Sequence, residues 1–150
     1  MKLSVKVALT VLAVALPAMV LGPIIWPPAD AGVEPTGMQV VLFVILAVGD
    51  ALFLGLGMAF LIFGYPVLRR VSPESRVRAW AMFVSVGYLL VSWWPHLNMH
   101  AANGLDLGGL LVIDYVFHLP LQIAGAVLAI SLLSLLVDRA GRPTEVAARS

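Results

Sequence analysis

Apolar residues along the chain fall into four long runs separated by short polar segments. Because an α-helix rises ~1.5 Å per residue, about 20 apolar residues cross a ~30 Å hydrocarbon layer. Each run is long enough for one crossing, and together the runs take up most of the 150 residues. We therefore predict an all-α fold, a polytopic membrane protein in which four transmembrane helices form a bundle and a single domain. The predicted spans are residues 5–26, 38–68, 73–94 and 108–137, followed by a polar tail at residues 138–150.

Proline and serine predict where the third helix begins and ends. Ser72 is expected to be the N-cap, with Pro73 at the first helical position. Pro95 disfavours the helical conformation for Trp94, so the third span is predicted to end at Trp94. Residues 96–107 are then expected to form a polar loop.

Breakers inside the runs predict a kink and close packing. Pro120 lacks an N–H group, which leaves the carbonyl of Val116 without its helical donor and favours a kink in the fourth span. Small residues let membrane helices approach closely. The second run contains four such residues, Gly49, Gly55, Gly57 and Gly64.

Basic residues are sorted to one side of this four-span arrangement. By the positive-inside rule that side is cytoplasmic, so we predict a multi-pass protein of the inner or plasma membrane with both termini in the cytoplasm. The charged residues of the opposite loops are all acidic: Asp30, Glu34 and Asp106. Trp26, Trp93 and Trp94 flank these loops, as expected of an interfacial aromatic belt. The nine basic residues are Lys2, Lys6, Arg69, Arg70, Arg76, Arg78, Arg139, Arg142 and Arg149.

The first run also has an alternative interpretation. A basic start and small residues before Ala31 are loosely typical of a cleaved signal peptide. The apolar stretch is longer than the ~7–15 residues of a signal peptide's apolar region, which favours a retained span.

Composition excludes several classes of function. Hydrophobic residues make up 61% of the chain and charged residues 11%, and the mean hydropathy is +1.02, which leaves no room for a soluble domain. A net charge of +1 gives no indication of nucleic-acid binding. Without cysteine there is no disulfide, thiolate metal site or iron–sulfur cluster. The sequence also lacks a glycine-rich phosphate loop and the common hydrolase motifs.

Polar residues recur at helical spacing inside three of the runs, and a buried ionisable group in hydrocarbon needs a partner or a wet cavity. In the fourth run Asp114, His118 and Gln122 are spaced i, i+4 and i+8, so their side chains are expected to share one face of the helix, directed into the bundle. The first run has no such stripe and is expected to pack at the periphery. The stripes are Gln39, Asp50, Gly57 and Gly64; Ser85, Tyr88, Ser92 and His96; and Asp114, His118 and Gln122.

All three histidines lie in the predicted outer half of the bundle. His96 and His100 are four residues apart, a spacing that presents two imidazoles to one ion if the segment is helical. With His118 and Asp114 they form a predicted ligand set for a transition metal, copper, zinc or iron, or for haem. Asp50 comes at the depth of His118 and is expected to pair with it. Additional or outer ligands are predicted among Asp50, Met99, Asn98, Gln122 and Tyr88.

Three classes of function remain open at this point. The first is a membrane protein with an outward-facing metal or haem site, used for metal handling or redox chemistry. The second is a proton or ion pathway, or a pocket for a small polar ligand, built from the same Asp and His residues. The third is an accessory or assembly subunit of a membrane complex. The predicted partners are the lipid bilayer and either further copies of the chain or a larger membrane complex, and the sequence does not decide whether the protein is an enzyme.

Overall fold

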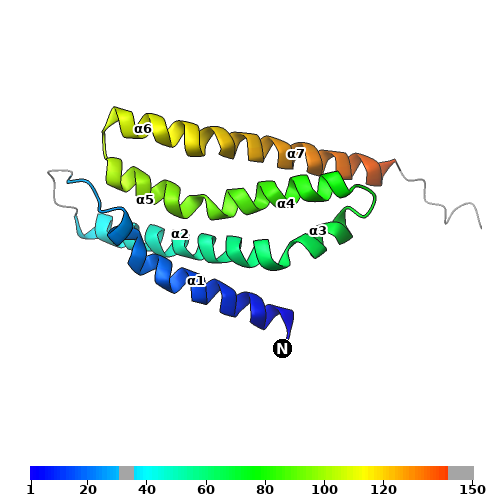
Figure 1. Ribbon diagram of the computed structural model, residues 1–150, viewed down its shortest axis with the longest axis horizontal. Helices are drawn as coiled ribbons and strands as arrows, with labels where there is room; N and C mark the ends of the chain where they lie inside the picture. Colours follow the sequence, from blue (N-terminus) through cyan, green and yellow to red (C-terminus); the bar gives the residue numbers. More distant parts are fainter. Residues whose placement is uncertain (31–35, 142–150) are drawn as a thin grey trace, which may run out of the picture.

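The computed structural model describes residues 1–30 and 36–141, and these residues form helices without strands. Four helical rods are long and apolar enough to cross a membrane. They pack as a row in chain order, each antiparallel to the next (Figure 1). The predicted all-α class and the four long apolar rods are thus confirmed, while insertion in a membrane stays a prediction. The segments are α1 (Leu3–Ile25), α2 (Gly37–Phe63), α3 (Tyr65–Val71), α4 (Arg76–Val91), α5 (Trp93–Asn103), α6 (Leu107–Ile113), the π-helical turn η1 (Asp114–His118) and α7 (Leu119–Ala140).

The third rod is longer than its predicted span. Pro95 cannot donate to the carbonyl of Val91, and the helix breaks there into α4 and α5. It resumes at once, since the His96 N–H donates to the carbonyl of Ser92 at 3.0 Å. The predicted end at Trp94 is therefore wrong, and the predicted loop at 96–107 is reduced to residues 104–106, between α5 and α6. Proline is tolerated in the first turn of a helix, so α5 continues to Asn103.

The start of the third rod also differs from the prediction. Ser75, not Ser72, is the N-cap, and its side chain accepts the N–H of Arg78 at 3.1 Å. Ser72 is fully buried instead, and its hydroxyl accepts Nε–H of Arg78 at 3.0 Å. The second run is likewise divided, because Pro66 has no N–H to continue the ladder beyond Phe63.

The fourth rod deviates from α-helical geometry at η1. The N–H of Leu119 bonds the carbonyl of Asp114, five residues earlier. Pro120 follows, and the carbonyl of Val116 that it leaves without a donor accepts the hydroxyl of Tyr88 at 2.8 Å. A side chain of the neighbouring rod thus replaces the backbone hydrogen bond whose loss Pro120 predicts.

Small residues bring α1, α2 and α4 together, as the glycines of the second run predict. A Cβ atom at Gly55 would lie 2.6 Å from the carbonyl oxygen of Val11, and one at Gly57 would lie 3.0 Å from the nitrogen of Val91. Gly49 faces open space. Large apolar side chains cover much of the outside of the rods, as a lipid-facing surface requires.

The described basic residues lie at the start of α1, in α3 and the first turn of α4, and at the C-terminus of α7. These three regions lie toward one end of the bundle (Figure 1). At the other end Trp26 packs edge-on against Trp94, with ring centroids 5.1 Å apart. Glu34, Arg142, Arg149 and most of the predicted polar tail lie outside the described residues. The orientation in a membrane stays a prediction.

Candidate metal centre

Two rods supply the three histidines of the candidate centre. His96 and His100 lie one turn apart on α5, and His118 is the last residue of η1 on the fourth rod. The helical spacing expected of His96 and His100 is confirmed, because the segment predicted as a loop is a helix. The break beside Pro95 on one rod and the π turn before Pro120 on the other adjoin these residues.

The Nε2 atoms of the three histidines converge. The distances are 2.9 Å between His96 and His118, 3.1 Å between His96 and His100, and 3.5 Å between His100 and His118. A tetrahedral ion with metal–nitrogen bonds of ~2.0–2.1 Å has nitrogens about 3.3 Å apart. The triangle therefore has the size of one face of a tetrahedral site, and the three residues together could hold a metal ion.

Asp114 contacts His118 and lies outside the group of three converging nitrogens. Nδ1–H of His118 donates to its carboxylate at 2.5 Å, on the side of the ring away from the other histidines. This bond places the proton on Nδ1 and leaves the lone pair of Nε2 directed toward the cluster. Asp114 is not among the three residues whose ligand atoms converge, so direct ligation by Asp114 stays a prediction. Its bond to Nδ1 has the arrangement that carboxylates have behind metal-bound histidines.

The cluster has a buried side and an accessible side. His96 is 7% exposed, and its ring lies beside Phe117 and Trp93, at centroid distances of 5.4 and 5.9 Å. On the other side the side chains of His118 and Asp114 are 39% and 59% exposed. The cluster is therefore covered on the side of the third rod and open on the side of the fourth rod.

Asp50 is buried on α2 and is not paired with His118. Only 8% of the residue is exposed, and the described residues offer it no hydrogen bond or ion pair. The expected pairing fails because Asp114, on the same rod as His118, already occupies Nδ1 of that ring.

The predicted inward stripe of the fourth rod is wrong. Gln122 is exposed, and so is Asp114, whereas Ile113, Phe117 and Ala124 are buried. An i, i+4, i+8 pattern keeps to one face only in a regular α-helix. The π turn interrupts that regularity at Asp114–His118, and the buried face of the rod there is formed by Ile113 and Phe117 instead.

The remaining predicted residues support the helices around the centre. Tyr88 bonds the carbonyl of Val116, as described above, and Asn98 donates to the carbonyl of Trp94 at 2.7 Å. Met99 is half-buried and accepts the side chain of Asn103 through its backbone carbonyl. In the second run Gln39 is exposed and accepts the backbone N–H of Thr36 in a capping box.

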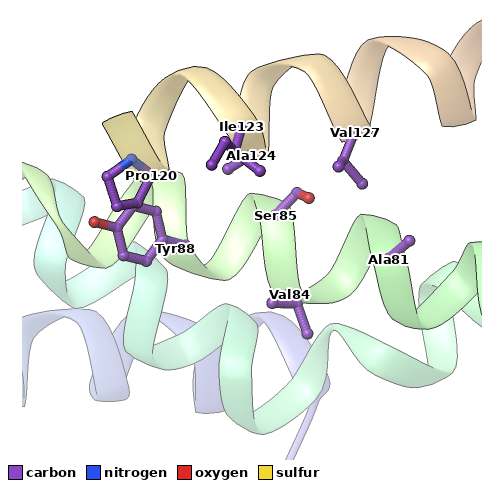
Figure 2. Close-up of a pocket in the computed structure, with 8 residues that line it drawn as sticks. All are labelled: Ala81, Val84, Ser85, Tyr88, Pro120, Ile123, Ala124 and Val127. Atoms are coloured by element: carbon purple, nitrogen blue, oxygen red, sulfur yellow. The ribbon is translucent and has the colours of Figure 1, made fainter. Parts of the chain in front are cut away.

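An apolar groove of about 300 Å³ runs between α4 and α7. Tyr88 and Pro120 close the end nearest the histidines, and Ser85 points into the gap between the helices (Figure 2). An alkyl chain lying in the groove would thus end two residues from His118. The groove is lined in part by Ala81, Ser85, Tyr88, Pro120, Ala124 and Val127.

The π turn and the aromatic rings beside the cluster are not predicted by the sequence pattern. Pro120 predicts an irregular backbone in the turn that precedes it, but nothing in the sequence distinguishes a π turn from a simple kink. The positions of Phe117 and Trp93 against His96 follow from that turn and from the break at Pro95, so they could not be placed without the tertiary structure.

The chain matches no protein-family model, no curated protein and no solved structure. Its function must therefore be argued from the site itself.

Proposed function

We propose that this is an integral membrane protein that binds one first-row transition-metal ion through His96, His100 and His118. The observation that carries the proposal is the convergence of three Nε2 atoms within 3.5 Å of one another. Each Nε2 carries either a proton or a lone pair, so N–H···N hydrogen bonds can satisfy at most two of the three contacts among these nitrogens. A shared cation removes this conflict.

The donor set favours an ion with an open coordination position. Among the described residues no carboxylate lies close enough to join the three ring nitrogens. Structural zinc sites are closed by four protein ligands, whereas catalytic and exchanging sites keep a position for water or substrate. With no thiolate present, imidazole ligation suits copper, zinc or iron.

Haem is a weaker candidate for the same residues. Two axial histidines approach a haem iron from opposite faces of the ring, so the ring lies between them. The three Nε2 atoms are instead in mutual contact. The spacing therefore favours a bare ion over haem.

The groove between α4 and α7 supports redox chemistry on a lipid-soluble substrate over metal handling. It is apolar, and Pro120 at its end is two residues from His118. Ala124→Trp should fill the groove and lower the binding of an alkyl-chain photoprobe while leaving the metal content unchanged. Unchanged labelling would favour metal handling.

Orientation follows from the positive-inside rule, with the basic end cytoplasmic and the histidines toward the outer surface. The chain contains no cysteine, so single introduced cysteines can report it directly. In right-side-out vesicles an impermeant maleimide should label Ala101→Cys and not Ser4→Cys. Labelling of Ser4→Cys alone would reverse the orientation.

The central experiment is metal analysis of detergent-purified protein, before and after incubation with Cu²⁺, Zn²⁺ or Fe²⁺. We expect about one ion per chain in the wild type and loss of the ion when the three histidines are changed to alanine. Gln122→Ala is the matched control, because it alters an exposed polar residue one turn beyond His118. Equal metal content in the wild type and the triple variant would refute the proposal and favour an ion pathway or an accessory subunit.

A further inference from the structure

The second ring nitrogen of His96 has no hydrogen-bond partner among the residues that the structure describes. Nδ1 is buried, and no hydrogen bond joins it to the described residues. If Nε2 binds a metal ion, the neutral ring carries its proton on Nδ1, which then becomes a buried donor. Metal-bound histidines almost always donate this N–H to a carboxylate, a carbonyl or water. His118 has such an acceptor in Asp114, and His96 lacks one.

A second unpartnered group lies in the neighbouring rod. Asp50 is 8% exposed, and no described residue bonds it. A carboxyl group inside a membrane protein is retained against a considerable insertion cost, which makes it a functional candidate by default. The buried acceptor and the buried donor thus complement each other.

The packing of α2 against the third rod puts these two residues at one level. The rods are antiparallel, and the rings of Phe53 and Trp93 face each other with centroids 6.4 Å apart. Three residues back along α2 from Phe53 is Asp50, and three residues forward from Trp93 is His96. Both steps lead toward the same end of the bundle.

The helical face of Asp50 is also the one that meets the third rod. Gly57 approaches Val91 so closely that an added Cβ would lie 2.7 Å from a side-chain carbon of Val91. Asp50 and Gly57 are seven residues apart, which is nearly two whole turns, so they share a face of α2. Asp50 therefore faces the third rod about two turns farther along, on the side where α5 lies.

We propose that Asp50 is the positioning residue of His96, accepting its Nδ1–H when Nε2 binds the ion. This inference rests on the proposed function. It gives the centre two carboxylates, Asp114 behind His118 and Asp50 behind His96. Their two negative charges balance a divalent ion, so the loaded centre is neutral overall in surroundings where an unbalanced charge is costly.

The test measures Co²⁺ binding, because the visible bands of Co²⁺ report the geometry of its ligands. Wild type, Asp50→Asn and Asp50→Leu are titrated in detergent, with folding checked by circular dichroism and gel filtration. We expect Asp50→Leu to weaken binding about 10- to 100-fold and to shift the bands, as the loss of an outer carboxylate does. Asp50→Asn keeps an acceptor oxygen without the charge, so we expect a smaller loss and a spectrum close to that of the wild type.

The outcomes separate this inference from the proposed function. Wild-type binding with unchanged affinity and bands in both variants would refute the role of Asp50 and leave the three-histidine site standing. Absence of Co²⁺ binding in the wild type would refute both. If Asp50→Leu does not fold, the near-isosteric Asp50→Asn decides, since an affinity equal to that of the wild type would overturn the charge-balancing role.

Discussion

The Nε2 atoms of His96 and His118 lie 2.9 Å apart, although the two residues belong to different rods and are separated by 22 positions in the chain. No backbone hydrogen bond requires this approach, and one proton at most can lie between the two nitrogens. A metal ion bound by both nitrogens would account for the contact.

Each histidine should be needed for tight binding. Changing His96, His100 or His118 singly to alanine leaves two imidazoles, so we expect the affinity for Co²⁺ to fall at least about 100-fold, more than for loss of an outer carboxylate. Titration followed by visible absorption measures the effect. Wild-type affinity in any one of the three variants would remove that residue from the ligand set.

The carboxylate of Asp114 should tune the site without binding the ion. Asp114→Asn weakens the bond that orients His118, and we expect a loss in metal affinity of about 10- to 100-fold with the metal content at saturation unchanged. Asp138→Asn is the control, because that carboxylate pairs with Arg78 at 2.6 Å at the basic end of the bundle. A loss of stoichiometry in Asp114→Asn would instead indicate direct ligation.

The hydroxyl of Tyr88 should stabilise the fourth rod through Val116. Tyr88→Phe removes the 2.8 Å hydrogen bond to a carbonyl that Pro120 leaves without a helical donor. We expect the free energy of unfolding to fall by about 0.5–1.5 kcal/mol, measured by denaturation in mixed micelles.

A double-mutant cycle checks the reason for that loss. Pro120→Ala restores a backbone N–H to the helix, so Tyr88→Phe should cost less in the Pro120→Ala background than in the wild type. Equal costs in the two backgrounds would contradict the link between Tyr88 and Pro120.

Two glycines of α2 should respond oppositely to alanine. A Cβ at Gly55 would meet the carbonyl oxygen of Val11 at 2.6 Å, so Gly55→Ala must separate α1 from α2 and should destabilise the bundle by roughly 1–3 kcal/mol. Gly49 faces open space, and Gly49→Ala should be neutral or stabilising by up to about 1 kcal/mol through helix propensity. The same denaturation assay compares them, and equal effects would contradict the close α1–α2 contact.

The hydrophobic pattern of the sequence was sufficient to predict the helical class and the four rods. Long apolar runs in a chain without a soluble domain leave few alternatives, because backbone polar groups in hydrocarbon must be satisfied within the helix. The spacing of His96 and His100 and the freed carbonyl of Val116 were also predictable, since both depend on residues within one turn of each other.

Only the tertiary structure decided how these parts meet. Pro95 breaks the third rod without ending it, and the π turn at Asp114–His118 ends at the histidine that meets α5. Whether a proline ends, kinks or interrupts a helix depends on which neighbouring groups satisfy the freed backbone. Tyr88 on an adjacent rod does so here. Sequence periodicity assumes an unbroken helix, and the candidate site lies where that assumption fails.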